Sequence, residues 1–236
     1  MIKIFVTDVS FLHDNTVFEA CKQTLPDFRL EKINRLKLRS DRNLSLGAWL
    51  LLENAVKHFG KNINLSSMQI HKGGKPYLPD FPDVHFSISH SGTMAMCAVS
   101  NKGIGADIQL VGNFKEDICN RYFTTVESSY ILGNDSAYEK RKRFFEIWTV
   151  KEAYSKMTGK GLGDFNNFEV VTGNEICIKH ENRKLPFFIS VYSVADYKLA
   201  ICTDDTSKPD FEFVKSEDLL GITSTINTND NSNTHG

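Results

Sequence analysis

Two long stretches of helical periodicity, far apart in the chain, constrain its fold most. Between residues 41 and 59 apolar side chains recur every three or four positions, with Ser40 placed to cap the first turn and Gly60 following the last. A second helix is predicted over residues 138–157, ended by Gly159. Strand-like segments follow each helix, so we expect two units built in the same order.

The predicted strands support this division. Residues 85–92 alternate and then break into a loop, residues 93–99 resume as a strand, and residues 104–110 begin the second unit. The late strand at residues 198–203 resembles residues 93–98 in its placement of small and apolar side chains, which indicates internal duplication. We therefore expect an N-terminal half over residues 1–103 and a C-terminal half over residues 104–215.

Composition excludes several classes of protein. The content of 41% hydrophobic and 24% charged residues is that of a soluble globular protein, and no apolar run is long enough to span a bilayer. The N-terminus alternates like a strand and lacks a secretory signal, so a cytoplasmic location is expected. The five scattered cysteines form no C-x-x-C pair, which argues against a disulfide framework and a thiolate zinc site. Residues 222–236 are polar and are expected to be disordered.

Two basic segments interrupt an almost neutral chain of net charge −1. The run at residues 140–143 is expected to be the solvated start of the second helix, with attraction of an acidic partner as an alternative hypothesis. In the segment from residue 29 to residue 43, a solvated helix face and an anion site are equally open. A nucleic-acid site is not expected there, because no aromatic residues are interleaved with the charges. The basic residues of this segment are Arg29, Lys32, Arg35, Lys37, Arg39 and Arg42.

Two short segments carry side chains suited to binding phosphate or a metal ion. Ser89 and His90 end a strand at a glycine turn, where a hydroxyl and an imidazole can converge on a phosphate or simply hydrogen-bond locally. Asp107 and Gln109 are two apart on a strand and therefore share a face, so both can offer oxygens to one hard cation. The alternative for this second pair is a polar strand face in water.

The second long helix carries a third such segment. Trp148, Glu152 and Lys156 recur at four-residue spacing and line one helix face. An exposed Glu152–Lys156 ion pair is the simplest interpretation. However, the pair follows an aromatic stripe that must be buried, so we expect it at the rim of a cleft.

In this order, the segments resemble the 4′-phosphopantetheinyl transferases of the type that activates surfactin synthetase. The resemblance covers about residues 30 to 205 and rests on motifs at familiar spacing. It implies an α+β fold of two similar halves, each a small antiparallel sheet packed on a long helix, with the active site between them. The matching motifs are Gly74-Lys-Pro-Tyr-Leu-Pro79, Phe86-Ser-Ile-Ser-His-Ser-Gly92, Gly105-Ala-Asp-Ile108, Trp148-Thr-Val-Lys-Glu-Ala153 and Gly159-Lys-Gly-Leu162.

The resemblance also implies the reaction and the roles of the site residues. The expected reaction is Mg²⁺-dependent transfer of 4′-phosphopantetheine from coenzyme A to a serine of an apo acyl or peptidyl carrier protein, with release of 3′,5′-ADP. Glu152 is expected to take the serine proton and Lys156 to assist the leaving group. The implied metal ligands are Asp107, Gln109 and Glu152, and the implied coenzyme A ligands are Arg42, Lys75, Pro76, Ser89, His90, Lys151 and Lys156.

Two positions depart from the family pattern. Gln109 stands where the family has a second acidic residue, so it offers a neutral oxygen and Mg²⁺ is expected to bind more weakly. Leu44 stands where family members often have an arginine, so Arg42 or a neighbouring basic residue is expected to contact the phosphates. The alternative function is a catalytically weak module that binds coenzyme A or a carrier protein. Because one chain supplies both halves, a monomer is expected.

Overall fold

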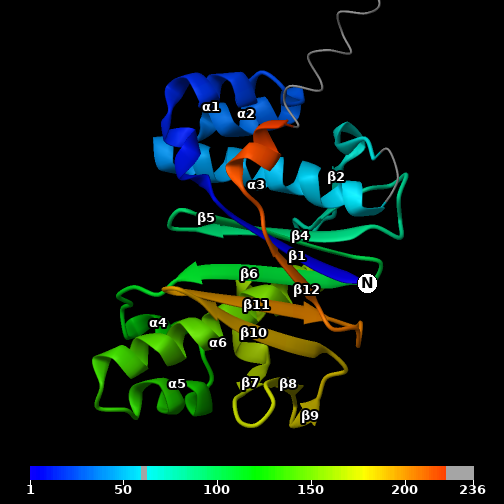
Figure 1. The fold of residues 1–236 in the computed structure, drawn as a ribbon. Coiled ribbons are helices and arrows are strands. Elements are labelled where there is room, and N and C mark those ends of the chain that lie inside the picture. Colours follow the sequence, from blue (N-terminus) through cyan, green and yellow to red (C-terminus); the bar gives the residue numbers. More distant parts are fainter. Residues whose placement is uncertain (60–62, 222–236) are drawn as a thin grey trace, which may run out of the picture.

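The computed structural model describes residues 1–59 and 63–221, and the tail expected to be disordered lies outside them. Two sheets form the centre of the molecule, with the long helix α3 (Arg39–Val56) on one side and the long helix α6 (Ala137–Thr158) on the other (Figure 1). The α+β fold with two helix-packed halves is thus confirmed. Among the described residues, no helix combines the length and apolar character needed to cross a bilayer.

The N-terminal sheet has the strand order β12-β1-β5-β4, and the C-terminal sheet has the order β10-β11-β6. All neighbouring strands in these two sheets are antiparallel except β12 and β1, which are parallel. The strands are β1 (Ile2–Asp8), β4 (His85–Ser91), β5 (Met94–Ser100), β6 (Ile104–Leu110), β10 (Phe188–Val194), β11 (Tyr197–Thr203) and β12 (Asp210–Phe213).

Shorter elements surround these layers. The remaining helices are α1 (Asn15–Lys22), α2 (Asp27–Arg35), α4 (Asp117–Tyr122) and α5 (Thr125–Leu132), with short 3-10 helices η1 (Val9–His13), η2 (Lys57–Phe59), η3 (Leu65–Ser67) and η4 (Leu162–Asn167). The remaining strands are β2 (Gln69–Ile70) and β3 (Pro76–Tyr77), which pair with each other, and β7 (Glu169–Val171), β8 (Cys177–His180) and β9 (Arg183–Lys184), which form a small sheet.

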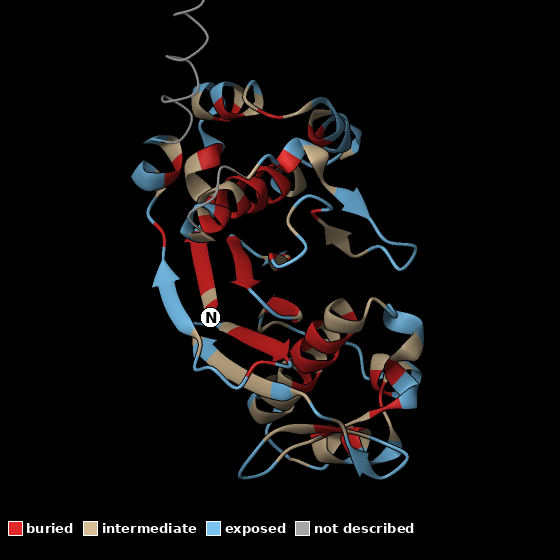
Figure 2. Ribbon diagram, turned by 90° about the vertical axis from the view of Figure 1, so that its right-hand side faces the viewer, coloured by how far each residue is buried: buried red, intermediate tan, exposed pale blue. Residues whose placement is uncertain are grey.

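Strand periodicity explains how the layers hold together. Successive side chains of a strand point to opposite faces, so β1 directs Phe5 into the core around α3 and Ile4 into the core between the two sheets. β5 is buried along its whole length because both of its faces are covered. Figure 2 shows the buried residues gathered along α3, the central strands and α6.

The two sheets meet where β4 lies beside β6. The hydroxyl oxygen of Ser87 accepts from the backbone N–H of Ala106 at 2.9 Å, and that of Ser91 accepts from the N–H of Leu110 at 3.0 Å. At this junction, serine hydroxyl groups therefore accept the hydrogen bonds that backbone carbonyl groups accept between paired strands of one sheet. The junction matters because it places the end of β4 and the middle of β6, two of the predicted site segments, next to each other.

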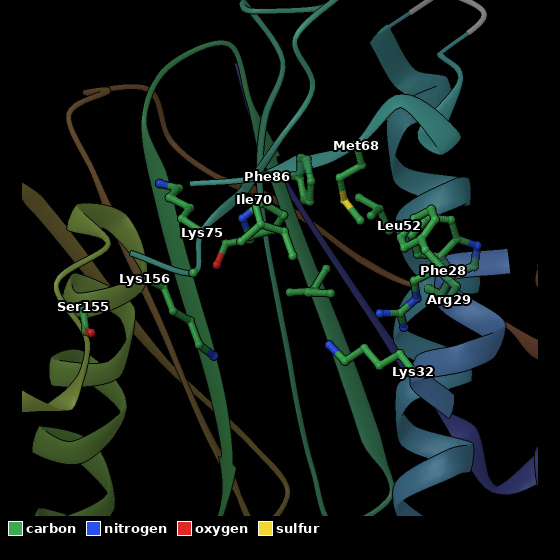
Figure 3. Close-up of a pocket in the computed structure, with 15 residues that line it drawn as sticks. Phe28, Arg29, Lys32, Leu52, Met68, Ile70, Lys75, Phe86, Ser155 and Lys156 are labelled. Atoms are coloured by element: carbon green, nitrogen blue, oxygen red, sulfur yellow. The ribbon is translucent and has the colours of Figure 1, made fainter. Parts of the chain in front are cut away.

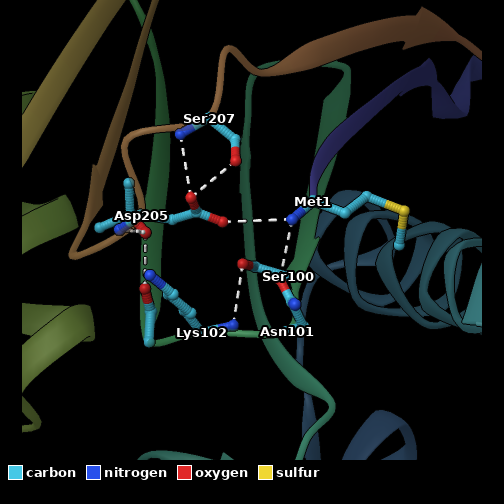
Figure 4. A network of polar contacts seen from close by, with 8 residues as sticks. Met1, Ser100, Asn101, Lys102, Asp205 and Ser207 are labelled. Atoms are coloured by element: carbon cyan, nitrogen blue, oxygen red, sulfur yellow. Dashed lines mark hydrogen bonds and ion pairs between the residues drawn. The ribbon is translucent and has the colours of Figure 1, made fainter.

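A polar network ties together the two segments that connect the halves (Figure 4). The amino group of Met1 donates to Asn101 Oδ1 at 2.8 Å and lies 3.2 Å from Asp205 Oδ2. Asp205 Oδ1 accepts from the backbone N–H and the hydroxyl of Ser207. The hydroxyl of Thr203 donates to the carbonyl oxygen of Gly103 at 2.8 Å. The chain passes from one half to the other near Asn101 and returns near Asp205, and these contacts hold the two connecting segments together.

Two expected boundaries differ from the structure. The first long helix begins at Arg39, with Leu38 in the cap position and no side-chain cap, whereas Ser40 was the expected cap. The C-terminal half was expected to extend to residue 215, but β12 joins the N-terminal sheet and Val214 is buried in the N-terminal core. The chain therefore returns to its first half after β11.

Candidate active site

Six of the residues predicted from the sequence line one cavity between the halves. Its volume is about 320 Å³, and its walls come from α2, α3, β4, β6 and α6. The two strand segments and the helix segment that were predicted to carry the site lie far apart in the sequence, and they meet at this cavity. The six residues are Ser89, His90, Asp107, Gln109, Glu152 and Lys156, and the other lining residues include Arg29, Lys32 and Ser45.

Close packing of α6 on β6 brings the two carboxylates to the same cavity. Gly105 lies against the helix backbone, and a Cβ at this position would overlap the carbonyl oxygen of Ala153. Glycine therefore allows a distance between strand and helix that a larger residue would prevent. Two residues further along β6, Asp107 faces the cavity, as does Glu152 on the helix.

Asp107 is the centre of the polar contacts in the cavity. The residue is only 1% exposed, and its carboxylate accepts from the Ser89 hydroxyl at 2.6 Å. The Lys156 ammonium lies 2.7 Å from the same oxygen, Oδ1, while Gln109 Nε2 donates to Oδ2 at 2.9 Å. A buried carboxylate with three such partners is held in one orientation. Strand β4 thus supplies the hydroxyl, β6 the acid and the amide, and α6 the cation.

Glu152 has an environment that favours proton transfer near neutral pH. Burial raises its pKa to about 7, and the negative charge of Asp107 adds to this rise, while the ammonium of Lys156 opposes it. A carboxyl group with such a pKa exchanges protons readily at physiological pH. The neighbouring His90 has its pKa lowered, first by burial and then by the charges of Lys156 and Lys32, so its neutral form is favoured.

The donor set of the cavity fits Mg²⁺. Asp107 and Glu152 offer two carboxylates, and Gln109 offers an amide oxygen on the same strand face as Asp107. Mg²⁺ commonly uses one or two carboxylates and completes its shell with water and substrate phosphate. No group of three or more His, Cys, Asp or Glu side chains suited to a metal ion occurs within residues 1–59 and 63–221.

A second, mainly apolar cavity of about 310 Å³ adjoins the first (Figure 3). Arg29, Lys32 and Lys156 line both cavities. In Figure 3 Arg29 and Lys32 approach from the side of α2, and Lys156 approaches from the side of α6. Three cationic groups therefore stand at the boundary between an apolar space and a carboxylate site. The apolar walls are formed mainly by Phe28, Trp49, Leu52, Met68, Ile70 and Phe86.

Arg29 is the site residue that the sequence did not single out. It is only 4% exposed, donates to the carbonyl and hydroxyl oxygens of Ser45, and lies over the Trp49 ring at 4.9 Å. Its Nε is buried and has no hydrogen-bond partner in the described structure. In the sequence it is one of six basic residues spread between positions 29 and 42, and only its buried place on α2 distinguishes it.

Two of the expected coenzyme ligands lie elsewhere. The side chain of Arg42 lines neither of these two cavities, and its Nε donates to the carbonyl oxygen of Leu36 at 2.8 Å. Lys151 is 0% exposed, and its ammonium forms an ion pair with Glu127 at 2.9 Å. We therefore assign Lys151 a structural role and correct its expected contact with coenzyme A. Leu44, at the departure from the family pattern, packs into the N-terminal core.

Lys75 and Pro76 line the second cavity. The ammonium of Lys75, however, is engaged by the other half of the protein. It donates to the carbonyl oxygens of Ile104 at 3.0 Å and Met157 at 2.9 Å. The basic run at residues 140–143 also has partners within the protein: Lys142 pairs with Glu139 at 3.2 Å, and Arg143 donates to the carbonyl oxygen of Tyr130.

Paired carboxylates for a hard cation, facing three cationic side chains, suit an enzyme that transfers a phosphate-containing group. The sequence model of the 4′-phosphopantetheinyl transferase superfamily matches residues 103–202, and the chain belongs to this family of transferases. It is 33% identical over 199 residues to a 4′-phosphopantetheinyl transferase of Bacillus subtilis, covering 80% of this chain and 87% of that protein.

Further relatives agree with this family. The 4′-phosphopantetheinyl transferase Sfp of Bacillus subtilis (strain 168) is 35% identical over 62% of this chain and 67% of its own length. The transferase gsp of Aneurinibacillus migulanus is 35% identical over 55% of each chain. The crystal structure of Thermotoga maritima holo-[acyl-carrier-protein] synthase aligns with a TM-score of 0.36 and 21% identity over 43% of this chain and 61% of that chain, a likeness too low to support an argument.

Proposed function

We propose that this enzyme transfers 4′-phosphopantetheine from coenzyme A to a serine hydroxyl of an apo acyl or peptidyl carrier protein, releases 3′,5′-ADP and depends on Mg²⁺. The observation that carries the proposal is the meeting of Asp107, Glu152 and Lys156 in one cavity between the halves. Family membership supports phosphopantetheinyl transfer, and the site geometry supports the assignment of individual roles.

Coenzyme A presents less polar parts, such as its adenine ring and the dimethyl group of pantetheine, and several phosphates, and these correspond in kind to the two adjoining cavities. In this proposal Arg29 and Lys32 hold phosphate oxygens from the side of α2, because both line the boundary between the cavities. Ser89 and His90 contact the coenzyme from β4, and Pro76 borders the apolar space. Bound Mg²⁺, held by Asp107 and Glu152 with Gln109, would neutralise charge on the pyrophosphate.

The reaction itself forms one bond and breaks another. The serine oxygen of the carrier attacks the phosphorus next to pantetheine, and the bond from that phosphorus to the bridging oxygen of the pyrophosphate breaks. Glu152 accepts the serine proton, directly or through water, because its carboxylate lies in the same cavity as Asp107 and Lys156. Lys156 lies one helical turn further on and stabilises or protonates the departing 3′,5′-ADP.

The test is incubation with coenzyme A, Mg²⁺ and a panel of apo acyl and peptidyl carriers, followed by mass spectrometry of each carrier. Addition of one phosphopantetheine mass is expected, and it should disappear when Mg²⁺ is removed with a chelator. No added mass on any carrier would reject the proposed transfer. If coenzyme A still binds under those conditions, the protein would instead be a catalytically weak module that binds coenzyme A or a carrier protein. The missing carboxylate at Gln109 would then explain the weak catalysis.

Two further expectations belong to this proposal. Because one chain supplies all residues of the cavity, we propose that the enzyme works as a monomer. Sedimentation of the active protein as a dimer that loses activity on dilution would contradict this. A cytoplasmic location, where coenzyme A and carrier proteins meet, is likewise proposed and is tested by cell fractionation.

A further inference from the structure

The turn between β2 and β3 reaches across from the N-terminal half to the C-terminal half. The backbone N–H of Gly74 donates to the carbonyl oxygen of His71 at 2.8 Å, and that of His71 donates to the carbonyl oxygen of Lys75 at 2.9 Å. The rings of His71 and Tyr77 stack at 3.9 Å. These contacts make the turn a defined structure, so the position of the Lys75 side chain follows from the fold.

Two carbonyl oxygens of the C-terminal half accept from the Lys75 ammonium. One belongs to Ile104, the first residue of β6, and the other to Met157, in the last turn of α6. The last carbonyls of a helix have no partner within it and carry the negative end of the helix dipole. An ammonium group is therefore well suited to this position.

Backbone packing reinforces the same contact. Gly73 lies against Gly159, the left-handed residue that ends α6, and a Cβ on Gly73 would overlap the Gly159 carbonyl oxygen. Gly74 in the same turn and Ser155 and Lys156 in α6 line the second cavity. The turn thus connects one wall of the cavity to the end of the helix that forms the other wall.

We propose that Lys75 is a positioning residue: it holds the end of α6, and through it Glu152 and Lys156, at a fixed distance from the coenzyme cavity. This inference rests on the proposed function for the roles of those two side chains. The ammonium has three N–H groups, and two are used by the carbonyl oxygens. A move to a coenzyme phosphate would leave two partly buried carbonyl oxygens without these donors, which is unfavourable.

The deciding variant is Lys75→Met, which keeps an unbranched side chain and removes the ammonium. We expect kcat to fall by about 10²-fold, the loss that a displacement of about 1 Å in a catalytic group can cause. The Kd of coenzyme A should change by less than about threefold, and by the same factor for 3′-dephospho-coenzyme A. A direct phosphate ligand would instead weaken coenzyme A binding by about tenfold or more. Lys32→Met, which removes a cation at the cavity boundary, is the matched comparison and should weaken binding.

A second variant tests the contact without changing a charge. Gly73→Ala must push the turn away from α6, so it should reproduce the loss in kcat, and both variants should speed hydrogen exchange of the amides in residues 155–159. Gly173→Ala is the control, because no atom of residues 1–59 or 63–221 lies within 4 Å of the added methyl group there. Gly73→Ala also keeps the test decisive if Lys75→Met fails to fold.

Some outcomes would overturn the proposal. A tenfold weaker affinity for coenzyme A with unchanged kcat, together with unchanged exchange at the end of α6, would make Lys75 a ligand. Hydrogen exchange and coenzyme affinity are measured without turnover. If the wild-type protein modifies no carrier, the proposed function fails, whereas these two measurements still decide whether Lys75 holds α6.

Discussion

Replacement of Lys151 by methionine would separate a structural lysine from a ligand of coenzyme A. The ammonium of Lys151 is completely buried beside Glu127, whose carboxylate is buried as well. It also donates to the carbonyl oxygens of Phe165 at 2.7 Å and Phe168 at 3.0 Å. Methionine has a similar unbranched shape but no donor. The substitution therefore leaves one carboxylate and two carbonyl oxygens without their partner.

The expected cost follows from the burial of this pair. Removing one partner of a buried ion pair typically costs about 3–5 kcal/mol, because the remaining charge is uncompensated. Burial already raises the pKa of Glu127 against the charge of Lys151, so the carboxyl group can protonate once the ammonium is gone. Protonation limits the loss, and we expect a decrease of about 3 kcal/mol in the free energy of unfolding.

Urea unfolding followed by circular dichroism measures this change, with equal m-values as the condition for comparison. Adding Glu127→Gln to Lys151→Met should recover part of the loss, because the double variant no longer buries an unpaired charge. Lys142→Met is the matched control: its partner Glu139 is exposed, so the loss should stay below about 1 kcal/mol. A loss below about 1 kcal/mol for Lys151→Met, combined with a raised KM for coenzyme A, would refute the structural role.

Three further predictions concern carboxyl groups. Glu152→Gln should lower kcat by about 10²-fold or more with an unchanged circular dichroism spectrum, and normal turnover would reject its role as the proton acceptor. Gln109→Glu should keep activity, lower the Mg²⁺ concentration for half-maximal rate and weaken coenzyme A binding in the absence of Mg²⁺; a higher Mg²⁺ requirement would contradict the assigned ligand set. Glu53 has its pKa raised to about 7 by burial, opposed by the hydrogen bond from Trp49 and by Lys57 and Arg29. The unfolded chain loses this proton near pH 4.5, so Glu53 by itself should lower the free energy of unfolding between pH 4.5 and pH 7 by up to about 3 kcal/mol. Glu53→Gln, which keeps an acceptor for Trp49 Nε1, should flatten that slope in pH-dependent urea unfolding, and an unchanged slope would show that another group causes it.

Local periodicity predicted the parts of the fold in which neighbours in sequence determine the structure. The end of α6 at Gly159 and the strands β4, β5 and β6 follow from helical and strand spacing. The path after β11 does not, because β12 is a short exposed strand whose partner β1 lies about 200 residues earlier. No local pattern encodes such a pairing.

The site shows the same division. Asp107 and Gln109 share a strand face, and Glu152 and Lys156 share a helix face, so each pair was predictable from spacing alone. Neighbouring residues on a helix point about 100° apart, and this explains why Glu152 faces the cavity while Lys151 enters the core. Both residues belong to one motif, and the sequence placed both in the active site, but only Glu152 lines the cavity. The meeting of the two pairs in space came only from the family resemblance.

The charges of the cavity explain how Gln109 can be compatible with the transfer. Arg29, Lys32 and Lys156 supply three positive charges, whereas Asp107 supplies one negative charge and Glu152 titrates at about pH 7. Coenzyme A brings a pyrophosphate and a phosphate monoester, and the monoester alone carries nearly two negative charges. Under the proposed function, the protein cations cannot neutralise this total, so a bound divalent ion would contribute directly to coenzyme binding. A third carboxylate at position 109 would bind that ion more tightly but would also cancel one of the three cations. Under the proposed function, glutamine would therefore weaken Mg²⁺ binding and strengthen the attraction of the cavity for the coenzyme phosphates.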